Sequence, residues 1–175
     1  MKTQKLFVIA AIVCLLVGVS GGAAMAEGCG DGVLRNETFD GTLRVTGDEP
    51  CVIIGCTIMG DLLVINVPYI LLLNNKVYGE IRVDGNAGNG VANVIANTVF
   101  SGSLVVKEYA TANVIENETL TGKEGKGNIR VIGNTNALVQ KNIAAHNLIC
   151  KETTSDLSSF LNFAGNKLNC SEDAQ

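Results

Sequence analysis

The sequence predicts an all-β fold, a single-stranded right-handed parallel β-helix of about six coils with about 20 residues in each coil. The first observation is a phrase that recurs along the chain as LLNNKVYGEI (72–81), VIANTVFSG (94–102) and VIENETLTG (114–122). The second is that apolar residues inside each phrase alternate with period two and are often β-branched, which is typical of short strands. The third is that no unit has an apolar stretch with helical spacing. Right-handed winding is expected because parallel crossovers are almost always right-handed.

The repeat becomes clear when each unit is aligned on one anchor position. The anchors are 19 to 25 residues apart, and they are Asn36, Cys56, Asn75, Asn97, Asn117, Asn142 and Asn166. Two residues earlier the first five units have an apolar residue, namely Leu34, Ile54, Leu73, Ile95 and Ile115. After the anchor they have a glycine, namely Gly41, Gly60, Gly79, Gly102 and Gly122, followed by a pair of the Leu-x-Val type. Each column is therefore expected to stack along the interior of the solenoid.

Asparagine dominates the anchor column, and two properties explain this choice. Asparagine tolerates the left-handed backbone conformation that a sharp corner requires. Stacked amides can also bond to each other and to the backbone. We expect a ladder formed by Asn36, Asn75, Asn97 and Asn117.

The first 26 residues have the pattern of a signal peptide. Lys2 and Lys5 precede an apolar run at 7–19, and Ala24-Met25-Ala26 is a typical cleavage site. The run is shorter than the roughly 20 residues that span a bilayer. We therefore expect a signal peptide at 1–26 and one β-helix domain at 27–175, with the mature protein secreted, periplasmic or on the cell surface, and with no membrane span after cleavage.

At this point the chain resembles the right-handed parallel β-helix repeat superfamily, which includes pectate lyases, polygalacturonases and NosD-like exported proteins. The resemblance covers about residues 34 to 170 and is carried by VIANTVFSG, VIENETLTG and LLNNKVYGEI. It implies the fold and says little about activity. The last two units depart from the pattern, because VQKNIAAHNLIC has no corner glycine and FAGNKLNC has no Leu-x-Val pair.

Charge and composition exclude some partners. Without Lys2 and Lys5, the 13 basic residues become 11 against 17 acidic ones, so the expected mature chain has a net charge of −6. This balance disfavours nucleic acids and anionic membranes, which attract basic surfaces. We expect no nucleic-acid partner.

Five cysteines follow the predicted signal peptide. Cys29 and Cys51 are 22 residues apart and Cys150 and Cys170 are 20 apart, so each pair spans about one coil. Neighbouring coils lie about 4.8 Å apart, which suits a disulfide. We predict disulfides Cys29–Cys51 and Cys150–Cys170 near the two ends, and a buried free thiol at Cys56.

One strip of polar residues invites a chemical interpretation. In β-helix polysaccharide lyases, acids on such a strip hold calcium while a basic side chain removes a proton from the sugar. Asp61, Glu80 and Asp84 with Arg82 have the residue types for that role. The acids alone supply too few ligands for calcium, which takes six to eight oxygens. A solvated face with Glu–Arg pairing is the favoured interpretation.

The loops that join the coils are mostly short, which argues against a deep pocket. Tyr69 and Tyr109 are candidates for stacking against a sugar at this edge, and partial packing over the coil is the favoured alternative. We therefore expect an exported structural or binding protein without catalysis or a cofactor, whose partner is a polysaccharide or another exported protein. Self-association through the coil ends is a further expectation. The alternative is a small calcium-dependent polysaccharide lyase or other carbohydrate-active protein.

Overall fold

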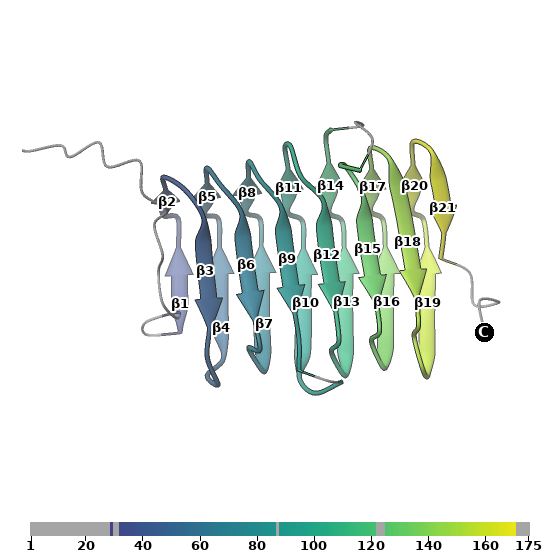
Figure 1. Cartoon of the computed structure of the whole chain (residues 1–175), viewed down its shortest axis with the longest axis horizontal. Helices are drawn as coiled ribbons and strands as arrows, with labels where there is room; N and C mark the ends of the chain where they lie inside the picture. Colours follow the sequence, from purple (N-terminus) through teal and green to yellow (C-terminus); the bar gives the residue numbers. More distant parts are fainter. Residues whose placement is uncertain (1–28, 30–31, 87, 122–124, 171–175) are drawn as a thin grey trace, which may run out of the picture.

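The computed structural model describes residue 29 and residues 32–86, 88–121 and 125–170. These residues form a parallel β-solenoid of seven coils, and each coil gives one strand to each of three parallel sheets (Figure 1). The prediction of about six coils is close, because the two irregular C-terminal units also form complete coils. The predicted signal peptide lies outside the described residues.

The three sheets, called A, B and C here, each contain seven strands. Sheet A consists of β1 (Val33–Arg35), β4 (Cys51–Ile54), β7 (Tyr69–Leu73), β10 (Val91–Ile95), β13 (Thr111–Ile115), β16 (Asn136–Gln140) and β19 (Asp156–Phe160). Sheet B consists of two-residue strands, namely β2 (Thr38–Phe39), β5 (Thr57–Ile58), β8 (Lys76–Val77), β11 (Thr98–Val99), β14 (Glu118–Thr119), β17 (Ile143–Ala144) and β20 (Phe163–Ala164). Sheet C consists of β3 (Leu43–Thr46), β6 (Leu62–Ile65), β9 (Ile81–Asp84), β12 (Leu104–Lys107), β15 (Ile129–Ile132), β18 (Asn147–Lys151) and β21 (Lys167–Asn169).

The winding is right-handed, as the sequence predicts. In Figure 1 the strands of sheet A rise at the back and those of sheet C descend at the front, while the chain advances from left to right. Every strand pairs in parallel with its equivalent in the next coil. Like residues therefore stack, as when Val94 lies opposite Val114 and Leu104 lies opposite Ile129. This hydrophobic interior is buried along the solenoid.

The interior column of sheet A lies one residue earlier than predicted. In coils two to five the predicted anchor-minus-two residues, Ile54, Leu73, Ile95 and Ile115, are only half-buried and face outward. Their predecessors Ile53, Leu72, Val94 and Val114 are completely buried. The two columns are both apolar, so residue type alone could not distinguish the inner face from the outer face.

The asparagine ladder is present at the corner between sheets A and B, with one correction at each end. Its members are Asn75, Asn97, Asn117, Asn142 and Asn162, and the first four are fully or almost fully buried. The backbone N–H of each asparagine donates to the side-chain oxygen of the next, as from Asn75 to Asn97 at 3.0 Å. Asn36 was predicted to belong to the ladder, but the register places it opposite Gly55, outside the ladder column.

The predicted reason for the asparagines was only half right. The left-handed corner residue is the one before each ladder position, with φ between 53° and 65° at Asn36, Gly55, Asn74, Ala96, Glu116, Lys141 and Leu161. The ladder asparagines themselves do not need that conformation. Their amides recur at the same corner of each coil because they satisfy buried backbone groups: Nδ2 of Asn117 donates to the carbonyl oxygen of Val94 at 2.7 Å.

Both predicted disulfides are present, at Cys29–Cys51 and Cys150–Cys170, with Cα atoms 5.6 and 4.6 Å apart. They connect the first and last coils to their neighbours. Cys56 is a free cysteine and is completely buried in the ladder column. Burial raises the pKa of its thiol, which favours the unreactive protonated form.

Candidate functional site

A cavity opens at the corner between sheets B and C, where a column of glycines lets successive coils approach closely. A Cβ atom on Gly79 would lie 2.7 Å from the carbonyl carbon of Gly60, and one on Gly102 would lie 2.5 Å from the carbonyl oxygen of Gly79. These glycines are therefore required for space. Gly122, predicted for this column, lies outside the described residues, and Gly127 continues the column through its bond to Gly102.

The cavity has a volume of about 370 Å³ and is lined mainly by polar groups. They are Asp61, Glu80, Ser101, Ser103 and Lys126, together with Gly79, Gly102 and Gly125. Two carboxylates, two hydroxyls and one ammonium group in a shallow cavity can bind a polyhydroxylated ligand by hydrogen bonds.

Asp61 and Glu80 occupy equivalent positions in neighbouring coils. The backbone N–H of Glu80 donates to Oδ1 of Asp61 at 2.7 Å. Burial raises the pKa of the Glu80 carboxyl, and the negative charge of Asp61 raises it further, while the positive charge of Arg82 opposes both effects. The Glu80 carboxyl therefore holds its proton to a higher pH than an ordinary glutamate.

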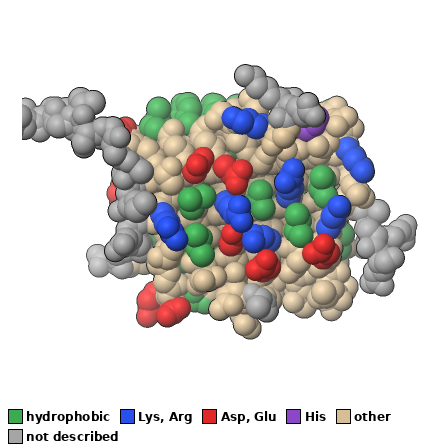
Figure 2. Space-filling view, viewed as in Figure 1, with side chains coloured by type: hydrophobic (Ala, Val, Ile, Leu, Met, Phe, Trp, Pro, Cys, Tyr) green, Lys and Arg blue, Asp and Glu red, His purple; other side chains and the backbone are tan. Residues whose placement is uncertain are grey.

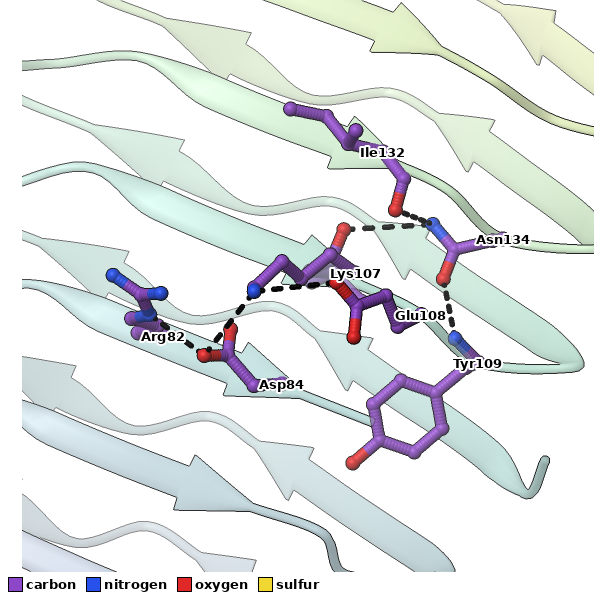
Figure 3. A network of polar contacts seen from close by, with 8 residues as sticks. Arg82, Asp84, Lys107, Glu108, Tyr109, Ile132 and Asn134 are labelled. Atoms are coloured by element: carbon purple, nitrogen blue, oxygen red, sulfur yellow. Dashed lines mark hydrogen bonds and ion pairs between the residues drawn. The ribbon is translucent and has the colours of Figure 1, made fainter. Parts of the chain in front are cut away.

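Asp84 belongs to a different group of side chains, shown in Figure 3. Its Oδ2 atom accepts from Nε of Arg82 at 2.9 Å and lies 3.6 Å from Nζ of Lys107, which is also 3.4 Å from Oε1 of Glu108. The other carboxylate oxygen, Oδ1, is buried and has no hydrogen-bond partner among the residues that the structure describes. Asp84 thus serves as the anion between two cations.

The positions of these two groups bear on the alternative in which Asp61, Glu80 and Asp84 hold calcium. Within the described ranges, no three side chains of His, Cys, Asp or Glu lie close enough together to hold a metal ion, and these three acids are no exception. The hydrogen bond from Arg82 to Asp84 raises the pKa of the guanidinium, followed by the charge of Asp84. Arg82 is therefore poorly suited to remove a proton from a sugar.

The two tyrosines proposed for sugar stacking have different environments. Tyr69 is 39% exposed at the start of β7. Tyr109 is completely buried, and its hydroxyl donates to the carbonyl oxygen of Val67 at 3.1 Å. Tyr109 is thus a core residue and offers no ring face to a ligand, so the prediction of a stacking site at Tyr109 is wrong.

Sequence reasoning also missed an exposed aromatic pair. Tyr78 and Phe100 stack on each other with ring centroids 4.5 Å apart and an angle of 8° between the ring planes. Met59 and Leu120 extend this row into the neighbouring coils and are 50% and 46% exposed. Because the two rings cover each other's faces along the coil stack, the row presents mainly ring edges to solvent, which are poorly suited to sugar stacking.

The outer face of sheet C carries several charged side chains. Its first outward column contains Arg44, Leu63, Arg82, Val105, Arg130 and Ile149, and its second contains Thr46, Ile65, Asp84, Lys107, Ile132 and Lys151. Figure 2 shows basic side chains spread over this face, with hydrophobic and acidic side chains among them. Together with the cavity at its edge, this face is the candidate functional site.

A row of asparagines borders this face in the last coils. Asn147 donates to Oδ1 of Asn128 at 2.9 Å, and Asn166 donates to Oδ1 of Asn147 at 2.9 Å. Asn166 was predicted as an anchor of the repeat, but its side chain belongs to this row and not to the ladder. The sequence has an asparagine at or just before the start of β15, β18 and β21, but only the structure shows that these side chains bond to one another.

No helix in the described part of the chain is long and apolar enough to cross a membrane. Comparisons with protein-family models, curated proteins and solved structures found no match to this chain. The candidate site therefore has to be interpreted from its own geometry.

Proposed function

We propose that this chain is an exported binding module, a short member of the right-handed β-helix repeat superfamily, which holds an extended carbohydrate against the outer face of sheet C. The observation that carries the proposal is the combination of a flat, charged sheet face with a polar cavity at its edge. A long ligand can lie across the coils, while the cavity supplies carboxylates and hydroxyls for sugar hydroxyl groups.

An oxidising compartment is consistent with the two disulfides, which persist outside the cytosol. The signal-peptide pattern of residues 1–26 supports the same location. Secretion to the cell surface, to the periplasm or to the medium is part of the proposal, as is a role without turnover.

Binding to neutral and acidic oligosaccharides, measured by calorimetry on the mature chain, tests the proposal. The variant Asp61→Asn/Glu80→Gln should weaken binding, because it removes two charged acceptors and leaves their shape nearly unchanged. Asp156→Asn on β19 is the control, because it removes a carboxylate from a strand of sheet A that does not line the cavity. Failure to bind any oligosaccharide would refute the proposal. Formation of an unsaturated uronate product with calcium present would show a lyase instead of a binding module.

A further inference from the structure

The outer face of sheet A is mostly apolar and almost free of charge. Parallel pairing aligns its outward side chains in two central columns that run through all seven strands. The first column contains Val33, Val52, Leu71, Asn93, Asn113, Leu138 and Ser158, and the second contains Arg35, Ile54, Leu73, Ile95, Ile115, Gln140 and Phe160. Arg35 is the single charged residue in these two columns. We call this surface the sheet A face.

Apolar side chains on both faces are typical of a parallel sheet that is covered on both faces. The inner residues of the sheet are covered by the core, since Ile53 and Leu72 are completely buried. Their outward neighbours Ile54 and Leu73 are only half-buried, so the described part of the chain leaves their tips exposed to water. On a monomeric protein, a contiguous apolar patch larger than a few hundred Å² marks an interaction surface.

The sheet A face is large enough for a stable interface. Its seven strands lie about 4.8 Å apart and a five-residue strand is about 16 Å long, so its flat footprint is about 450 Å². Because side-chain relief makes the accessible area larger than the footprint, two such faces in contact bury about 1,200 Å² in total, the lower limit for a specific interface. The face is also flat, since equivalent residues of successive coils stand at the same height above the sheet.

We propose that the sheet A face is a dimer interface, which packs against the same face of a second copy of this chain. Two apolar sheets pack face to face about 10 Å apart. A two-fold axis parallel to β10, the middle strand of the seven, makes the two solenoids antiparallel and lets one surface be its own partner. In this arrangement Ile95 lies opposite Ile95 of the second copy, and Leu73 lies opposite Ile115 of the second copy.

The polar residues of the sheet A face are compatible with this arrangement. The same axis places Arg35, in the first coil, opposite Phe160 in the last coil of the second copy, because both residues belong to the second column. A guanidinium over an aromatic ring is a favourable contact. Near the middle of the face, Nδ2 of Asn113 donates to Oδ1 of Asn93 at 2.8 Å, so these amides already satisfy part of their hydrogen bonding when water is excluded.

The border of the sheet A face favours a second copy over a lipid surface. Proteins that lie on membranes surround their apolar face with basic residues. Here Glu116 and Lys141, which follow β13 and β16, pair with each other at 3.1 Å, and Asp156 at the start of β19 is acidic. The border therefore has no excess of positive charge to attract anionic lipids.

The dimer goes beyond the proposed carbohydrate binding and does not depend on it. Sheets A and C lie on opposite sides of the solenoid (Figure 1). Pairing through the sheet A face therefore leaves the outer face of sheet C uncovered in both copies.

Analytical ultracentrifugation of the mature chain over a range of concentrations tests the inference. The wild type should dimerise with a dissociation constant of about 10 μM or lower. The test variant is Leu73→Gln/Ile95→Gln, and the fold accepts glutamine in this column because Gln140 already occupies it. Each substitution should raise the dissociation constant at least about tenfold, since an aliphatic side chain no longer leaves water on dimerisation.

The matched control is Met59→Gln/Leu120→Gln, which makes the same kind of change at residues that directly follow β5 and β14 of sheet B. These two side chains are 50% and 46% exposed, more than the half-buried pair of the test variant. The control should leave the dissociation constant unchanged. A second test variant, Leu71→Asn, places an amide next to Asn93 in the first column and should weaken the dimer about tenfold.

Dimers of the wild type and of the control, with weakened dimers of the two test variants, would support the inference. Circular dichroism checks that each variant is folded, and Leu71→Asn decides the matter if the double variant is not. A monomeric wild type, an unweakened test variant or an equally weakened control would overturn the inference, and so would binding to phosphatidylcholine vesicles in place of dimerisation. The oligosaccharide measurement is separate, so dimerisation and carbohydrate binding can fail independently.

Discussion

Replacing Asn117 by alanine tests whether the amide ladder holds the coils together. The Asn117 side-chain oxygen accepts from the backbone N–H of Asn97 at 3.0 Å, and among the described residues that buried N–H has no other acceptor. Its amide nitrogen donates to the carbonyl oxygens of Val94 at 2.7 Å and of Ile115 at 3.1 Å. In Asn117→Ala the Asn97 N–H loses its partner, which costs about 1–3 kcal/mol for a buried group.

The variant also loses the hydrogen bonds of the Asn117 amide nitrogen and leaves a small space with polar walls. The expected loss in the free energy of unfolding is therefore about 2–4 kcal/mol in total. For a chain of this size, that loss lowers the melting temperature by roughly 4–16 °C. Thermal and urea unfolding followed by circular dichroism measure it.

Asn113→Ala is the matched control for Asn117→Ala. Asn113 lies in the same coil, on strand β13, but faces outward and is half-buried. Within the described residues its side chain forms one hydrogen bond, from Nδ2 to Oδ1 of Asn93 at 2.8 Å. Water can replace that bond, so we expect a loss below about 1 kcal/mol. If both variants lost the same stability, the ladder would be incidental to the fold and the reasoning would be refuted.

Three further variants test other parts of the structure. Cys56→Asn should stabilise the protein by about 0.5–1.5 kcal/mol in urea unfolding. The reason is that the new side-chain amide can donate to Oδ1 of Asn75, which already accepts from the Cys56 N–H. A destabilised variant would contradict this expectation. Gly79→Ala should lower the free energy of unfolding by at least about 1–3 kcal/mol in the same assay, because the new Cβ would clash with the Gly60 backbone. An unchanged urea midpoint would show that the coils can separate there. Burial raises the pKa of Glu80, so its contribution to stability is complete below the ordinary glutamate pKa and is lost as pH rises through the raised value. Glu80→Gln should therefore flatten the decline in urea midpoint between the ordinary glutamate pKa and the raised pKa of Glu80, and an unaltered pH profile would refute the raised pKa of Glu80.

The fold could be predicted because one constraint repeats in every coil. The glycines at the corner and the alternating apolar residues recur at nearly fixed spacing, so the parallel stack followed directly from the sequence. The disulfides followed from the same spacing, because one coil of sequence brings Cys29 to Cys51 and Cys150 to Cys170. Shifts of one residue were harder to detect. Asn36 and Glu37 are both polar, and only the pairing of Arg35 with Ile54 shows that Asn36 lies before the ladder column.

The candidate site could be predicted only in part. Asp61 and Glu80 were found because they occupy the same position in neighbouring units. Asp84 was grouped with them by residue type, although the two-residue step along β9 directs it toward Arg82 and Lys107 instead. The net charge of the chain also gave no indication of the basic side chains on the outer face of sheet C. Net charge is a sum over the whole surface, whereas a solenoid arranges its residues in columns, so one face can be basic on an acidic protein.

This sorting also explains how such a scaffold can acquire a binding surface at small cost to its stability. The interior columns and the amide ladder determine the register, and a change such as Asn117→Ala disturbs several buried groups at once. The outward positions of sheet C contribute little to that register, so Arg130 and Lys151 are free to vary. Yet the buried ladder sets the distance between them, because each coil must lie one strand spacing from the next. A ligand that contacts several coils of sheet C therefore depends on a spacing that the buried ladder fixes. We expect a weakened ladder, as in Asn117→Ala, to reduce the affinity for such a ligand before it unfolds the chain.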